Sequence, residues 1–76
     1  MMLAPPTLTQ LFAQLGLASD AANIKQFIHQ HAVPVGVLLA SADFWTQGQA
    51  QFLQEALDED ADWAEIIDQL DTMLRK

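Results

Sequence analysis

The chain has 76 residues, no cysteine, and ten acidic against three basic residues, which gives a net charge of −7. This length predicts one domain, and the lack of cysteine excludes disulfides and thiolate metal sites. The acidic balance excludes nucleic acid and anionic membrane as expected partners, because both attract cationic patches.

Residues 1–6 are predicted to be a flexible lead-in, because Pro5 and Pro6 cannot donate the hydrogen bonds of a helix interior. They lack the basic start and long apolar run of a secretory signal. No apolar stretch reaches the ~20 residues of a membrane helix. We therefore expect a cytoplasmic protein in which residues 7–76 form a single helical domain.

A first helix is expected over residues 8–15, where Leu8, Leu11, Phe12 and Leu15 recur at helical spacing. Thr7 and Gln10 have the spacing of a capping box, in which each side chain bonds to the backbone of the other residue. Gly16 follows the last apolar residue and suits the left-handed position that ends a helix. The helix is therefore bounded on both sides by sequence signals.

A second helix is expected over residues 20–31, with Ser19 as its N-cap and Asp20 in its first turn. Val33 precedes Pro34 and is disfavoured from helical geometry, so this helix ends near His31. The short link to the first helix predicts a helical hairpin.

Residues 32–43 form an apolar connector that two structures could satisfy. The branched and aliphatic residues after Pro34 could form a strand, but the chain offers no second strand, so a strand would need a partner from another subunit. We favour an irregular connector that lies across the core.

A third helix is expected over residues 47–57, opened by a second capping box of Thr46 and Gln49. A fourth is expected over residues 61–75, with a stripe of Trp63, Ile66, Ile67, Leu70, Met73 and Leu74. We predict a break near residues 58–60, because continuing that stripe backwards would place acidic side chains on its apolar face.

These patterns predict an all-α fold, a compact bundle of about four short helices. The expected core is Leu8, Leu11, Phe12, Leu15, Ile24, Phe27, Ile28, Phe52, Leu53, Leu57, Trp63, Ile67, Leu70 and Leu74.

Asp58, Asp60 and Asp62 have the alternating spacing of a calcium-binding loop. Such a loop also needs glycine at its sixth position and glutamate at its twelfth, where this chain has Trp63 and Gln69. We therefore interpret the three aspartates as helix caps and solvating groups.

The remaining reactive side chains do not form a catalytic or metal-binding pattern. His29 and His31 are two residues apart and would point in different directions on a helix, so they cannot chelate one ion together. Ser41 lacks the glycines of a nucleophile elbow. We predict no catalytic residue, no metal site, no cofactor and no enzymatic activity.

The apolar content of 51% is high for a chain that buries only roughly 60% of its unfolded surface. This excess favours a protein-interaction module that self-associates as a homodimer. The alternative is an acidic binding protein or inhibitor that docks on a basic protein surface. The candidate interaction surface comprises Val35, Val37, Leu38, Phe44, Trp45, Trp63, Asp58, Glu59, Asp60 and Asp62.

Three segments carry a resemblance to a known family: LFAQLGL (Leu11–Leu17), FW followed by QAQFLQEAL (Phe44–Leu57), and DADWAEIIDQLD (Asp60–Asp71). With these segments the chain resembles a family of small bacterial proteins that carries only a domain-of-unknown-function label. The resemblance implies a mostly helical, cytoplasmic protein of about this length, and it implies no activity, cofactor or catalytic residue.

Overall fold

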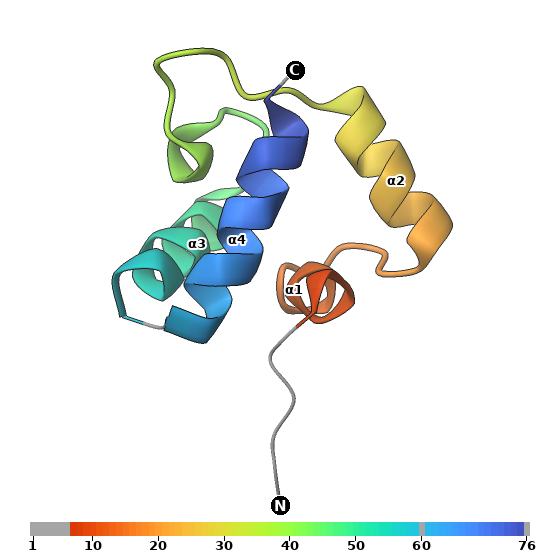
Figure 1. Ribbon diagram of the computed structural model, residues 1–76, viewed down its shortest axis with the longest axis horizontal. Helices are drawn as coiled ribbons and strands as arrows, with labels where there is room; N and C mark the ends of the chain where they lie inside the picture. Colours follow the sequence, from red (N-terminus) through yellow and green to blue (C-terminus); the bar gives the residue numbers. More distant parts are fainter. Residues whose placement is uncertain (1–6, 60, 76) are drawn as a thin grey trace, which may run out of the picture.

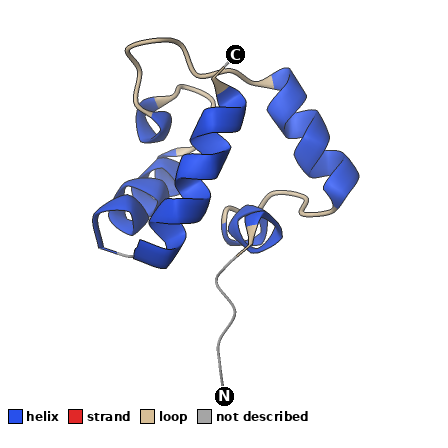
Figure 2. Ribbon diagram, viewed as in Figure 1, coloured by secondary structure: helices blue, strands red, loops and turns tan. Residues whose placement is uncertain are grey.

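The computed structural model describes residues 7–59 and 61–75. It contains α1 (Leu8–Gln14), α2 (Ala21–Gln30), a 3-10 turn η1 (Leu39–Ser41), α3 (Gln47–Glu59) and α4 (Ala61–Leu74). All of these residues lie in helices, turns or loops, and none lies in a strand (Figure 2). The prediction of an all-α fold is confirmed, and an irregular connector is found between α2 and α3.

Helix α4 is the centre of the bundle. It contacts α3 on one side and α1 and α2 on the other (Figure 1). The first two helices contact each other, but Figure 1 shows α1 nearly end-on while α2 lies across the view, so they cross and do not run antiparallel as in the predicted hairpin. Both also contact the central helix, which supplies apolar surface that each of them covers.

Both predicted capping boxes are present. The Thr7 backbone N–H donates to Gln10 Oε1 at 2.8 Å, and the Gln10 N–H donates to Thr7 Oγ1 at 3.2 Å. The Thr46 N–H donates to Gln49 Oε1 at 2.9 Å, and the Gln49 N–H donates to Thr46 Oγ1 at 3.2 Å. The Gln49 amide also donates to the Leu15 carbonyl at 2.8 Å, which ties the start of α3 to the end of α1.

The cap of α2 is Asp20, and the assignment of this role to Ser19 was wrong. The Asp20 carboxylate accepts a bond from Asn23 Nδ2 at 2.6 Å and one from the Asn23 backbone N–H at 3.1 Å. These two bonds lower the pKa of Asp20 below its ordinary value. Asp20 lies three residues before Asn23, the spacing at which an N-cap side chain reaches the backbone N–H of the third helical residue.

Helix α1 ends at a glycine, as predicted. Gly16 has φ +73°, the Gly16 N–H donates to the Ala13 carbonyl at 3.1 Å, and the Leu17 N–H donates to the Phe12 carbonyl at 2.9 Å. This is a Schellman motif, which satisfies carbonyls that the helix leaves unpaired. The turn leads the chain from α1 toward α2.

The core combines the predicted helix stripes with residues of the connector. Eight predicted core residues are buried, namely Leu11, Phe12, Leu15, Ile24, Leu53, Ile67, Leu70 and Leu74. The other six pack against them in partly buried positions. Five buried residues before α3 were not predicted, namely Val33, Leu39, Ala40, Ala42 and Trp45. The connector therefore covers one end of the bundle with its own apolar side chains.

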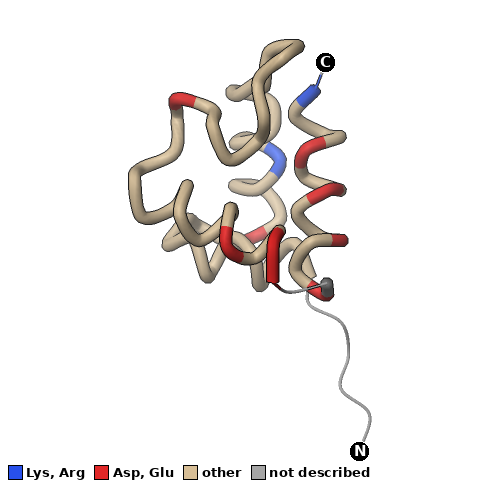
Figure 3. The backbone as a smooth tube through the Cα atoms, turned by 90° about the vertical axis from the view of Figure 1, so that its left-hand side faces the viewer, with Lys and Arg blue, Asp and Glu red and all other residues tan. Residues whose placement is uncertain are grey.

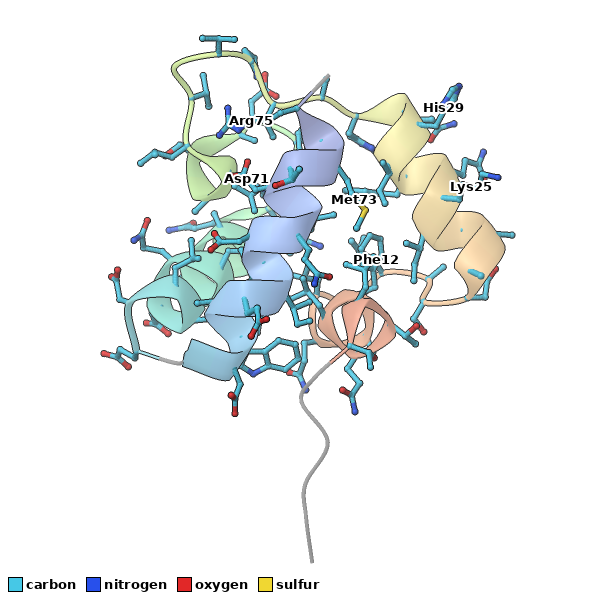
Figure 4. All side chains as sticks on the ribbon, in the orientation of Figure 1. Phe12, Lys25, His29, Asp71, Met73 and Arg75 are labelled. Atoms are coloured by element: carbon cyan, nitrogen blue, oxygen red, sulfur yellow. The ribbon has the colours of Figure 1, made fainter. Side chains whose placement is uncertain are left out.

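The predicted break between the last two helices is confirmed, because α3 ends at Glu59 and α4 begins at Ala61. The two helices form a hairpin whose contact face is made by the predicted stripes. Met73 belongs to the α4 stripe but is 40% exposed. In Figure 4 it lies on the side of α4 that faces α2.

Candidate interaction surface

The connector contains a tight turn. The Val37 N–H donates to the Pro34 carbonyl at 3.1 Å, and Gly36 has φ +87°. A type II turn requires a positive φ at its third residue, which Gly36 supplies without a steric penalty. Upstream of the turn, the Val33 N–H donates to the Leu74 carbonyl at 2.9 Å and attaches the chain to the end of α4.

Arg75 holds this turn in place. Its Nη1 donates to the Pro34 carbonyl at 3.1 Å and its Nη2 donates to the Val37 carbonyl at 2.7 Å. Its Nε donates to Asp71 Oδ1 at 2.8 Å, which orients the guanidinium. The planar fork of an arginine suits such a set of parallel bonds. No local pattern in the sequence points to bonds between Arg75 and a segment about 40 positions away, so this role was missed.

The turn presents apolar side chains to solvent. Val35 is 102% exposed and Leu38 is 70% exposed. Val37 lies between them in the chain and is half-buried, because it packs against the core. Of the predicted surface residues in this turn region, Val35 and Leu38 are therefore exposed, whereas Val37 packs mainly against the core.

Trp45 lies inside the protein and does not belong to the candidate surface. Its side chain is 8% exposed, and its Nε1 donates to the Leu39 carbonyl at 2.8 Å. The indole thus gains apolar contacts and satisfies its N–H within the fold. Phe44, beside it, is half-buried and packs against the core, so it offers at most one edge to a partner.

An aromatic cluster links α2 to the connector, and the sequence did not predict it. Phe27 stacks on His31 with ring centroids 4.0 Å apart and on Trp45 at 5.6 Å. Phe44 lies 4.7 Å from His31 and 4.8 Å from Trp45, again between ring centroids. His31 Nδ1 is 2.8 Å from the Phe27 carbonyl oxygen. The signal in the sequence was the four-residue spacing of Phe27 and His31, which places both rings on one helix face.

Trp63 occupies the opposite end of α4 from the turn. It is half-buried, packs against the core, and meets Phe52 of α3 edge to face, with ring centroids 5.8 Å apart. Twelve residues separate it from Arg75, and at 1.5 Å per residue this is roughly 18 Å along the helix. The structure therefore divides the predicted surface into an apolar turn at one end and an aromatic, acidic region at the other.

The acidic members of the predicted surface lie around the link between α3 and α4. Asp58, Glu59 and Asp62 are exposed, and Asp60 lies outside the described residues. Figure 3 shows further acidic positions along α4, with a basic residue at its C-terminal end. Since these acids are spread along both helices, they give the hairpin a negative charge.

A groove of about 260 Å³ lies between the connector, α3 and α4. Leu38, Leu39, Leu57 and Ile67 line it with apolar side chains, of which Leu38 and Leu57 are the accessible ones. Polar residues also line it, namely Gln54, Asp58, Asp68, Asp71 and Arg75. Figure 4 shows Asp71 and Arg75 on the side of α4 opposite to Met73. The groove adjoins the exposed turn, because Leu38 belongs to both.

Within residues 7–59 and 61–75, no group of three or more histidine or acidic side chains is placed to hold a metal ion. Over the same residues, no helix is both long and apolar enough to span a membrane.

Comparisons with known proteins identify the family. Residues 1–74 match the family described as protein of unknown function (DUF2789). No curated protein matches the sequence. A protein from Chromobacterium violaceum, known from a solution NMR structure, is 47% identical over 90% of this chain and 86% of that chain, with a TM-score of 0.79. The chain therefore belongs to the DUF2789 family, as its three resembling segments predicted.

Proposed function

We propose that the chain is a small protein-interaction module that self-associates through the exposed turn between α2 and α3. The observation that supports this is the exposure of Val35 and Leu38, 102% and 70% respectively, on a turn that Arg75 holds by two hydrogen bonds. Apolar side chains in water gain free energy when a second surface covers them. Because the backbone of the turn is already ordered, association does not have to order it.

The size of this surface sets the expected strength. Stable protein interfaces bury about 1,200–2,000 Å² in total, which two side chains from each copy cannot reach. The contact therefore extends from the turn onto neighbouring surface, and we expect a dissociation constant in the range of about micromolar to millimolar. The proposal assigns no catalytic role and no cofactor to the protein.

Sedimentation equilibrium over about 10 μM to 1 mM protein tests the proposal. We expect the mean mass to rise above the 8.4 kDa of one chain, and Val35→Ser to suppress that rise. Met73→Ser is the control, because it also removes an exposed apolar side chain but on the side of α4 that faces α2. The proposal is refuted if the mean mass remains 8.4 kDa at about 1 mM protein. It is also refuted if the two substitutions change the mean mass equally.

The second candidate function is an acidic binding protein that docks on a basic protein surface. The groove with its three carboxylates favours it. Ionic strength separates the two candidates, because contacts between exposed charges weaken as salt rises whereas apolar contacts persist.

A further inference from the structure

We propose that the groove between the connector, α3 and α4 binds a single lysine or arginine side chain, presented by an apolar segment of another protein. The inference rests on the proposed role of the chain in protein interaction and does not depend on its self-association. Three properties of the groove support it, namely its size, its charge and its apolar wall.

The size indicates one long side chain. Sites for small molecules and cofactors usually measure about 300–1,000 Å³ and enclose most of the ligand. This groove measures about 260 Å³ and is partly open to solvent. It can accept a side chain that enters from a docked segment.

The charge indicates a cation. Asp58, Asp68 and Asp71 line the groove, and Arg75 is the one basic residue among its lining residues. Arg75 already donates to Asp71 and to two connector carbonyls. Asp58 accepts a bond from the uncharged Gln54 amide at 3.3 Å. Within the part of the chain that the structure describes, Asp68 forms no ion pair, so an incoming cation would meet a carboxylate that Arg75 does not neutralise.

The arrangement distinguishes between kinds of cation. A divalent metal ion needs several oxygen ligands at short range, and no three acidic or histidine side chains of the described residues are so placed. Leu38, which is largely exposed, and the half-buried Leu57 instead offer apolar surface beside the carboxylates. The alkyl stem of lysine or arginine covers such a surface while its charged head reaches the acidic rim. Polyanions such as nucleic acid are repelled.

The chain itself is poor in suitable groups. It has three basic residues, of which Arg75 is part of the groove and Lys76 lies outside the described residues. Lys25 projects from α2 on the side away from α4, beside Ala22, Gln26, His29 and Gln30, and is the one basic residue of the described chain outside the groove (Figure 4). A second copy therefore offers a single cation from within a folded helix, which favours another protein as the occupant.

Nuclear magnetic resonance titration of the full chain tests the inference, with an amphipathic peptide of leucine and lysine as the probe. We expect saturable shifts of the backbone amides of Leu57, Ile67 and Asp68. The control peptide has glutamate in place of every lysine, and we expect it to cause no such shifts. The titration is done at a protein concentration where the chain is monomeric.

Two matched variants test the site. Asp68→Asn removes a carboxylate from the groove, and Glu65→Gln removes one from the same helix outside the groove. A charge-assisted bond is about twice as strong as a neutral one, so we expect Asp68→Asn to weaken peptide binding about tenfold. Glu65→Gln should weaken it by less than about twofold, because its charge acts only at longer range. Both residues are exposed on α4, so neither change should affect folding.

Equal weakening by the two variants would overturn the inference, because it would show diffuse attraction to the acidic surface. Shifts confined to other elements, or equal binding of the glutamate peptide, would also overturn it. Val35→Ser lies outside the groove and keeps peptide affinity unchanged if the inference holds. If the chain binds the peptide but does not self-associate, only the proposed dimer is refuted. If it self-associates but does not bind the peptide, only the groove site is refuted.

Discussion

The connector between α2 and α3 and the hairpin of α3 and α4 are stabilised in different ways. In the hairpin, Leu53, Ile67 and Leu70 are fully buried, so its contact face depends on apolar area. In the connector, bonds from Arg75 and Trp45 to backbone carbonyls hold the chain. Apolar contact tolerates small shifts, whereas a hydrogen bond weakens steeply with geometry. A short loop can therefore be ordered by a few directional bonds, and loss of one bond should act locally.

The two tryptophans extend the comparison. Trp45 anchors the connector and is buried, whereas Trp63 belongs to the hairpin and is half-buried beside Phe52. The sequence analysis placed both tryptophans in the candidate surface but only Trp63 in the expected core. It therefore predicted deeper burial for Trp63, which is the reverse of what the structure shows. Position in a helix stripe therefore did not determine which indole is more deeply buried.

The largest effect is expected at Trp45. Trp45→Ala removes a buried indole and should lower the free energy of unfolding by roughly 3–5 kcal/mol, a large part of the stability of so small a domain. Trp45→Phe keeps most of the packing but leaves the Leu39 carbonyl with only the Ala42 N–H as a donor, and should cost about 1–2 kcal/mol. Urea unfolding measures both. If both variants unfold like the parent, the connector does not depend on this anchor.

A smaller effect is expected at Trp63. Because its indole is half-buried, Trp63→Ala should cost about half as much as Trp45→Ala, roughly 2 kcal/mol. In single-tryptophan variants made by replacing the other indole with phenylalanine, emission from Trp45 should be blue-shifted relative to that from Trp63. A larger loss of stability at Trp63 than at Trp45, or a bluer emission from Trp63, would contradict the deeper burial of Trp45.

Arg75 tests whether directional bonds order the connector. Arg75→Lys keeps the charge but cannot donate to Asp71 and two carbonyls at once, and should cost about 1–2 kcal/mol. Hydrogen exchange should show faster exchange of the Val37 amide, with little change in the amides of α3. Uniformly faster exchange across α3 would show that the bonds of Arg75 stabilise the whole domain and not the connector alone.

Two glycines give a matched pair of smaller effects. An added Cβ meets no atom within 4 Å at Gly36 or at Gly48, so space does not decide either case. Gly36 has φ +87°, and Gly36→Ala should destabilise by about 1 kcal/mol because alanine disfavours that conformation. Gly48 lies in the first turn of α3, and Gly48→Ala should stabilise by about 0.5 kcal/mol. Thermal unfolding of both variants measures these changes in stability. If both substitutions change the stability in the same direction, the assigned turn geometry is contradicted.

The smallest effect concerns the cap of α2. Because the hydrogen bonds from Asn23 lower the pKa of Asp20 in the folded state, the folded chain binds this proton less readily than the unfolded chain. The ionised cap therefore stabilises the fold above the ordinary pKa of about 3.8, and this contribution is lost as the pH falls through the lowered value. Asp20→Asn should be less stable than the parent at pH 7, and the gap should narrow in acid. A gap that is constant between pH 7 and pH 2.5 would refute the assignment.

Much of the secondary structure could be predicted because its signals are local. The capping boxes at Thr7 and Thr46, the left-handed glycine at Gly16 and the break before α4 involve residues within four positions of each other. Apolar periodicity likewise predicted that Leu70 and Leu74 are buried. These features depend on backbone geometry and on side-chain direction along one helix, both of which the neighbouring residues determine.

The tertiary structure alone decided the candidate site. The bonds from Arg75 to the connector join residues 38 and 41 positions apart, and the bond from Gln49 to Leu15 spans 34 positions. No periodicity encodes such pairs, because they depend on how the helices cross. The sequence by itself thus determined which residues are helical and which faces are apolar. The packing of α4 against the rest decided that Trp45 is buried, that the turn is exposed, and that three carboxylates share one groove.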